Sequence, residues 1–210
     1  MVKRIPVSAD PGDVELHRRG IDRLVFFSDA VVAIAITLIV LPLVDDARNV
    51  GDASAWLFLH EHSADLVSAG VSFYAIAAFW LHHHGLFGRA TGYTTMLLWS
   101  NMLWLAGTVF LPIATVLQVG LSSARGGTVL YLATLTFIMV VSRVQSVVLV
   151  RSGLLADIAE HLRRRTRWTT WIPPVILGLA TIAVAVYPRI GLWALAGLAL
   201  QRPLERLSKH

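Results

Sequence analysis

Apolar segments near the length that crosses a bilayer recur along this chain and restrict what it can fold into. We identify six, the last with a short apolar core at residues 191–200: 22–44, 65–84, 93–118, 128–150, 169–186 and 190–203. A membrane-spanning helix needs about 20 predominantly apolar residues. The composition agrees, because only 15% of the 210 residues are charged, whereas soluble domains carry about 25%. The sequence therefore predicts an all-α integral membrane protein with six transmembrane helices per subunit.

The distribution of basic residues predicts the orientation of these helices. With a cytoplasmic amino terminus, fourteen of the 18 Lys and Arg residues fall in inner segments, three fall in outer loops, and Arg143 lies inside the fourth span. The positive-inside rule then places both termini of a multi-pass cell-membrane protein in the cytoplasm. The net charge of +5 thus reports topology and indicates no nucleic-acid partner. We expect a cytoplasmic tail over residues 1–20 and a single membrane domain over 21–207.

The first span combines charged residues with a regular apolar stripe. Ile34, Leu38 and Leu41 follow at i, i+4 and i+7, so they share one side of a helix. The stripe has two readings. It either contacts lipid and neighbouring helices, or it meets its symmetry mates at an oligomer axis. In the second case, rings of branched apolar side chains would gate a pore by excluding water. Arg23 and Asp29 in the same span favour a position inside the assembly, because charges in a membrane helix need partners.

Several polar residues lie at matching depth near the inner face. Asp29 suits the positive end of a helix dipole, or it belongs to a network between helices with a histidine as donor. Trp80 and His83 end the second span, and Asn101 lies two turns into the third. The histidines at 82–84 point about 100° apart on a helix, so they predict no metal site. Thr37 either bonds back to its own helix backbone or orders water or an ion beside the stripe.

Three motifs resemble the transmembrane-protein-175 channel family. The first motif is Arg23-x-x-x-Phe27-Ser28-Asp29 followed by AVVAIAITLIVLPL. The second is Trp80-x-x-His83-His84-x-Leu86-Phe87, and the third is Asn101-x-x-Trp104 with Leu111-Pro112. The likeness covers most of the chain and fades after about residue 125. The TVGYG-like filter of other potassium channels is absent; the nearest match, residues 91–93, lies in an inner loop that we interpret as a turn.

The resemblance implies a homotetrameric potassium channel in the lipid bilayer, with the first helix of each subunit lining the pore. Ile34 would form the main constriction, with Leu38 and Leu41 as further rings. Thr37 would contribute to potassium selectivity, and Ala33 replaces a serine that is frequent in relatives. Potassium would be the permeant ion, and no cofactor is implied. The residues implied to hold the inner end of the pore helix are Arg23, Phe27, Ser28, Asp29, Trp80, His83 and Asn101.

Two other functions are weighed against a channel. A proton- or cation-coupled secondary transporter would use Asp29 and His83 as a relay, but the sequence shows no inverted repeat. An intramembrane enzyme would need a motif such as HExxH or a nucleophile elbow, and the sequence contains neither. The absence of cysteine also excludes a thiol nucleophile and disulfides. We therefore predict a protein that is not an enzyme.

Overall fold

The computed structural model describes residues 11–49, 51, 54–120, 125–155 and 172–186. Within these residues the chain is all-helical, with no strand and a single isolated bridge between Ala90 and Leu155. The helices are α1 (Pro11–Leu38), α2 (Leu41–Arg48), α3 (Ala55–Glu61), α4 (Ser63–Phe87), α5 (Thr95–Gly120), α6 (Arg125–Arg151) and α8 (Ile172–Val186).

Four of the predicted spans are confirmed as helices long and apolar enough to cross a membrane. They cover Arg19–Arg48, Ser63–Phe87, Thr95–Gly120 and Gly126–Arg151. The fifth predicted span corresponds to α8, a shorter apolar helix of 15 residues whose first turn contains Pro173 and Pro174, where proline is tolerated. The sixth, at 190–203, lies outside the described residues. The chain is thus a multi-pass helical membrane protein.

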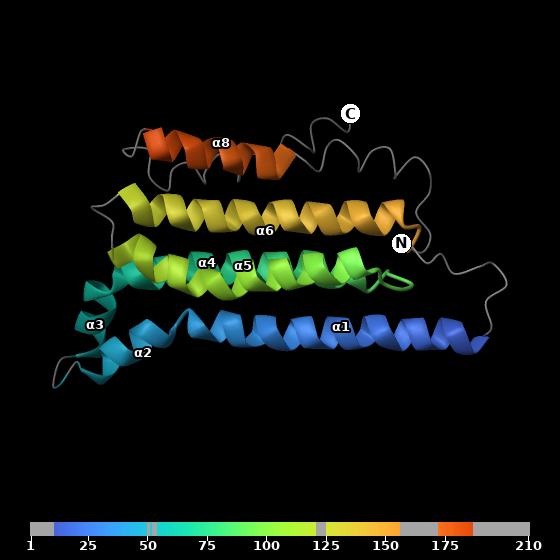
Figure 1. The fold of residues 1–210 in the computed structure, drawn as a ribbon. Helices are drawn as coiled ribbons and strands as arrows, with labels where there is room; N and C mark the ends of the chain where they lie inside the picture. Colours follow the sequence, from blue (N-terminus) through green and yellow to red (C-terminus); the bar gives the residue numbers. More distant parts are fainter. Residues whose placement is uncertain (1–10, 50, 52–53, 121–124, 156–171, 187–210) are drawn as a thin grey trace, which may run out of the picture.

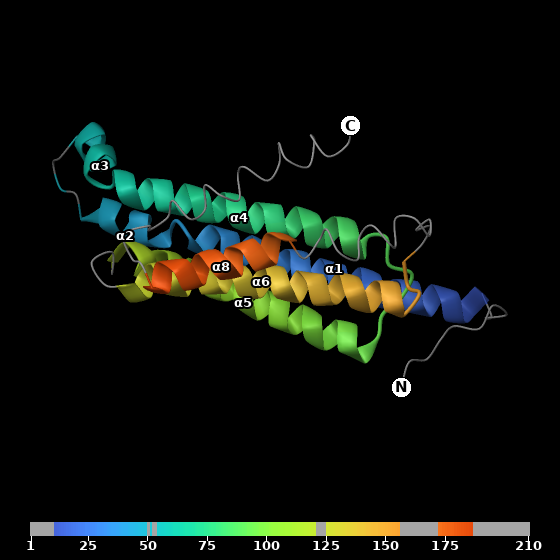
Figure 2. The same cartoon turned by 90° about the horizontal axis from the view of Figure 1, so that it is seen from above.

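The helices form layers, with α1 at one edge. Figure 1 shows α1 below the pair α4 and α5, followed by α6 and then α8, and Figure 2 shows the same helices from above. In the most apolar window of each span, 50% of the residues of α5 and 56% of those of α6 are buried, against 28% for the span that contains α1 and 22% for α4. The centre of the subunit is therefore α5 and α6, whereas α1 packs along one side only.

The first span is not one continuous helix, contrary to the prediction for the stripe at Ile34, Leu38 and Leu41. The α1 helix ends at Leu38, and α2 begins at Leu41 with Pro42 in its first turn. Proline has no N–H to donate to the carbonyl four residues earlier, and its ring clashes with that carbonyl. The helix therefore breaks one turn before Pro42, and Leu41 follows the break. At the other end, α1 begins at Pro11, within the segment predicted as a tail.

Two apolar clusters hold α1 against the other helices. The larger one includes Val32 of α1 and Ile39 of the break after it, together with Ile76, Trp104 and Leu111 of α4 and α5. The smaller one, nearer the beginning of α1, joins residues of four helices: Ile21, Leu24, Phe87, Leu97, Val148 and Leu149. Because lipid tails are as apolar as these side chains, such packing stabilises a membrane bundle through van der Waals contact and not through removal from water. One side of α1 is consequently anchored along its length by apolar packing.

Buried hydroxyl groups join α4, α5 and α6 nearer the end of the bundle at which α1 ends. Ser72 donates to the Tyr131 hydroxyl at 3.1 Å and accepts from Thr115 at 2.8 Å, and Ser68 donates to Gln118 at 3.0 Å. These bonds cross between helices in the apolar interior, where each contributes about 0.6 kcal/mol on average. They fix the frame against which α1 packs.

Candidate functional site

The α1 helix has a packed side and an exposed side. The packed side consists of Ile21, Leu24, Ser28, Val32, Ala35 and Ile39, all buried. The exposed side consists of Arg23, Phe26, Phe27, Ala33, Ile34, Thr37 and Leu38. Both sets repeat at intervals of three or four residues, which is the spacing of one helix side. Ile34, Thr37 and Leu38, which are expected to line a pore, therefore lie on the side of α1 that faces away from α4 and α5.

A buried hydrogen-bonded chain ties the packed side of α1 to α4 and α5. The Ser28 hydroxyl donates to the carbonyl of Leu24 at 2.8 Å and accepts from the Asn101 amide nitrogen at 2.9 Å. The Asn101 amide oxygen lies 2.8 Å from His83 Nε2. Because that oxygen can only accept, this arrangement requires His83 to carry its proton on Nε2. The predicted grouping of Ser28, Asn101 and His83 is what the structure brings together.

The His83 ring is enclosed by aromatic side chains. It stacks on Phe87 at 4.1 Å and on Trp104 at 4.3 Å, both with an interplanar angle of 18°. All three side chains are almost fully buried. Among the described residues, His83 Nδ1 and Trp104 Nε1 have no hydrogen-bond partner. The aromatic stack therefore fixes the ring plane, so that Nε2 points at Asn101.

Asp29 forms a second polar contact between α1 and α4. Its carboxylate accepts from Trp80 Nε1 at 2.8 Å and lies 3.5 Å from His84 Nδ1. Trp80 and His84 are one turn apart on α4, so both reach the same carboxylate. A histidine was expected to donate to Asp29, and His83 was the histidine that the resemblance implied for the network. In the structure His84 occupies that position, and His83 turns to Asn101.

Two residues that were predicted to belong to the network lie apart from it, and one residue of the network was not predicted. Arg23 and Phe27 lie on the exposed side of α1. Gln145 of α6 is buried, and its amide nitrogen lies 3.5 Å from the Asn101 oxygen and 3.4 Å from the Ser100 carbonyl. An amide inside the fourth predicted span, five residues before its end, was the signal that would have found it. Of the described residues, no three His, Asp or Glu side chains group in a way that would hold a metal ion.

The predicted constriction and selectivity residues are exposed on α1 and α2. Ile34 has 63% of its surface exposed, and Leu38 and Leu41 have 40% and 48%. The Thr37 hydroxyl donates to the carbonyl of Ile34 at 2.8 Å, which is the backbone bond that threonine commonly makes in membrane helices. That bond uses the hydroxyl proton and leaves the oxygen lone pairs on the exposed side.

A partly open cavity of about 180 Å³ lies behind the break in the first span. It is lined by residues from the break and from α4 and α5, including Ile39, Pro42, Asp46, Asp65, Ser68 and Thr115. Ile39 is eleven residues beyond Ser28, which is about 16 Å along a helix. The cavity is thus separate from the polar network at the inner end.

Fold and site together define a polytopic helical membrane protein whose first helix is anchored by polar contacts on one side and exposed on the other. Residues 23–112 match a family model described as the endosomal/lysosomal potassium channel TMEM175. A protein of Chryseobacterium sp. (strain P1-3) named as a potassium channel is 29% identical over 189 residues, which are 89% of this chain and 95% of that protein. These two similarities support the resemblance to the TMEM175 family that the motifs indicated. That family is one of channels and not of enzymes.

Proposed function

We propose that this protein is a homotetrameric, potassium-permeable cation channel whose pore is lined by the exposed side of α1. The observation that carries the proposal is the division of α1 into two sides. One side is fixed by the Ser28–Asn101–His83 chain and by apolar packing, and the other presents Ile34 and Thr37. In a symmetric assembly, four copies of such an edge helix meet at one axis.

The constriction in this proposal is the ring of four Ile34 side chains. A narrow neck lined by branched apolar groups excludes water and so blocks hydrated ions. Leu38 forms a second ring one turn further out. Leu41 follows the break at Pro42 and belongs to the outer mouth. Opening requires α1 to rotate or to splay away from the axis.

Selectivity in this proposal depends on Thr37. Since its hydroxyl proton is engaged by the Ile34 carbonyl, the oxygen is free to accept from water or to contact a cation. Ala33, one position before Ile34, adds no hydroxyl of its own. We therefore propose a preference for potassium over sodium that rests on one hydroxyl per subunit.

The remaining parts of the proposal concern the ends of the pore. Both termini face the cytoplasm, with a tail over residues 1–20 and a membrane domain over 21–207. Potassium is the permeant ion, and no cofactor takes part. On the outer side, α2 carries Asp45 and Asp46 with Arg48, which pairs with Asp45 at 3.3 Å. This segment has a net charge of −1 and attracts cations to the mouth over a Debye length of about 8 Å.

The decisive experiment is the reversal potential of the purified protein in a planar bilayer with potassium on one side and sodium on the other. A channel of the proposed kind gives a current that reverses toward the potassium equilibrium potential. A current that reverses near zero retains the pore and refutes its selectivity. A saturable flux with fixed ion stoichiometry identifies the coupled transporter instead. A protein that is shown to be a folded tetramer and carries no current contradicts the proposal.

A further inference from the structure

The inner loop between α4 and α5 is tied to the end of α6. The backbone N–H and the hydroxyl of Thr91 both donate to the carbonyl of Leu154, at 2.8 and 3.1 Å. The neighbouring residues Ala90 and Leu155 form an antiparallel bridge. These contacts join two segments that are more than 60 residues apart in sequence, so the loop has a fixed position relative to α6.

The anchor at Leu154 is itself held by the end of α6. Gly153 has a φ of +67°, the left-handed conformation that commonly terminates a helix. The N–H of Leu154 then donates to the carbonyl of Leu149 at 3.1 Å, and that of Gly153 to Val150 at 3.2 Å. The Leu154 carbonyl therefore belongs to the helix terminus and offers a firm attachment for Thr91.

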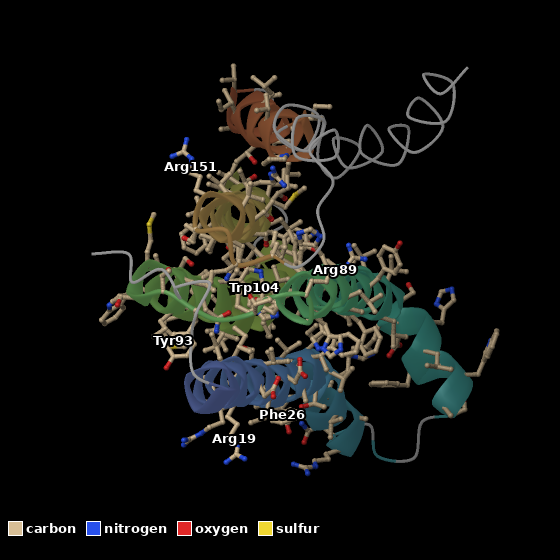
Figure 3. All side chains as sticks on the ribbon, turned by 90° about the vertical axis from the view of Figure 1, so that its right-hand side faces the viewer. Arg19, Phe26, Arg89, Tyr93, Trp104 and Arg151 are labelled. Atoms are coloured by element: carbon tan, nitrogen blue, oxygen red, sulfur yellow. The ribbon has the colours of Figure 1, made fainter. Side chains whose placement is uncertain are left out.

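The other end of this loop touches α1 at Gly20. A Cβ atom on Gly20 would lie 2.4 Å from Cε1 of Tyr93 and 3.2 Å from its hydroxyl oxygen. Figure 3, which looks along the bundle, shows Tyr93 between the ribbons of α1 and α5. The ring edge thus rests directly on the helix backbone, an approach that only glycine permits.

Gly20 lies on the same line of α1 as the proposed constriction. Gly20, Phe27 and Ile34 follow at intervals of seven residues, and such positions drift by only about 20° per heptad around a helix. Ile21, at the centre of the inner apolar cluster, lies about 100° away around the helix. The cluster therefore holds α1 against the bundle, whereas Tyr93 blocks its flank. A roll of α1 that turned Ile34 would press Gly20 against Tyr93 or lift it away.

We propose that Tyr93, seated on Gly20 and anchored through Thr91 to Leu154, is a stop that limits the rotation of α1 about its axis. The proposal deepens the channel function and rests on it, because the rotation matters through Ile34. Tyr93 is a positioning residue that acts on the pore from about 21 Å away, the length of fourteen helical residues.

The test measures helix position and ion flux in the same variants. Because the chain has no cysteine, spin labels can be placed at Asp22→Cys on α1 and Arg151→Cys on α6, both exposed. Labelled subunits are diluted with unlabelled ones in the tetramer, and the distance distribution is recorded by pulsed electron resonance. The variants are Tyr93→Ala, Tyr93→Phe, Gly20→Ala and the double change Gly20→Ala/Tyr93→Ala. Gly85→Ala is the matched control, since a Cβ there meets nothing within 4 Å.

The stop predicts a specific pattern across these variants. Tyr93→Ala broadens the distance distribution and raises potassium flux, whereas Tyr93→Phe, which keeps the ring, does neither. Gly20→Ala shifts the distance if the Tyr93 ring is held in place, because the added Cβ would overlap that ring. That shift is lost in the double variant, which behaves like Tyr93→Ala.

Three results would overturn the stop. These are a distribution unchanged by Tyr93→Ala, a Gly20→Ala shift that persists without Tyr93, or a Gly85→Ala effect of the same size. If the wild-type protein carries no current, the channel proposal fails, and the distance measurement still decides whether the stop exists. If the current is present and neither flux nor distance responds to Tyr93, the stop alone fails.

Discussion

Replacing Asn101 with alanine tests whether the buried chain between Ser28 and His83 stabilises the position of α1. Asn101 is fully buried, donates to Ser28 at 2.9 Å and accepts from His83 at 2.8 Å. The alanine variant removes both bonds at once, together with the longer 3.5 Å contact from Gln145. Ser28 keeps its bond to the Leu24 carbonyl, but the Nε2 proton of His83 is left without its acceptor. The two partners are therefore affected unequally.

The expected loss of stability follows from these separate effects. The lost bond between helices at Ser28 contributes about 0.6 kcal/mol, the average in a membrane protein. An unsatisfied buried donor at His83 costs about 1–3 kcal/mol. With the small packing defect at the truncated side chain, Asn101→Ala should reduce the free energy of unfolding by about 2–4 kcal/mol. Thr108→Ala is the matched control, because Thr108 is equally buried on α5 and bonds only to its own helix at Trp104.

The assay is reversible unfolding in mixed detergent micelles, followed by the near-ultraviolet signal of the tryptophans. A double-mutant cycle with Ser28→Ala and Asn101→Ala isolates the bond between them. Its coupling energy should be about 0.6 kcal/mol, the average for bonds between membrane helices, and no more than about 1.7 kcal/mol. A coupling of zero within error refutes the energetic role of this bond. An Asn101→Ala loss no larger than that of Thr108→Ala refutes the role of the whole chain.

The remaining predictions concern the exposed side of α1 and its second polar contact. Ile34→Asn makes the proposed neck wettable and should raise the leak conductance in bilayer recordings; an unchanged current removes Ile34 from the pore. Thr37→Ala should lower the potassium-to-sodium permeability ratio, whereas Thr37→Ser, which keeps the hydroxyl, should preserve it. Equal ratios in all three proteins remove Thr37 from the selectivity site. Trp80→Phe deletes the donor to Asp29 and should lower stability by about 1.5–3 kcal/mol, the range for a bond to a charged group; a Tm equal to that of the wild type contradicts this.

The sequence predicted the elements of the fold because membrane spans depend on length and apolarity, which are local properties. Depth in adjacent spans indicated that polar residues of the first three helices could share one network, and the family resemblance added Ser28 to Asn101 and His83. Depth does not determine which way a helix is turned. Neighbouring residues on α4 differ by about 100° in direction, so depth alone did not assign His84 to Asp29 and His83 to Asn101. That assignment depends on how α4 packs against both α1 and α5.

Other features of the structure could not be predicted from the local pattern of apolar and polar residues. The break before Pro42 was readable from proline chemistry, but the apolar run on both sides suggested one unbroken span. Gln145 lies beyond residue 125, where the family resemblance faded, and only its burial against Ser100 and Asn101 identifies it as part of the network. The tie between Thr91 and Leu154 is a contact between distant segments, which no spacing in the sequence predicts.

The arrangement of contacts along α1 indicates where this helix can move at least cost. The directional bonds at Ser28 and Asp29 lie in its inner part, and the Tyr93 contact at Gly20 is further inward. Beyond Asp29 the packed side is apolar, with Val32, Ala35 and Ile39. Apolar contacts depend on buried area and not on direction, so a small roll or tilt keeps most of their energy, whereas it would break the inner hydrogen bonds. Movement should therefore concentrate between Asp29 and the break after Leu38, which is the stretch that carries Ile34.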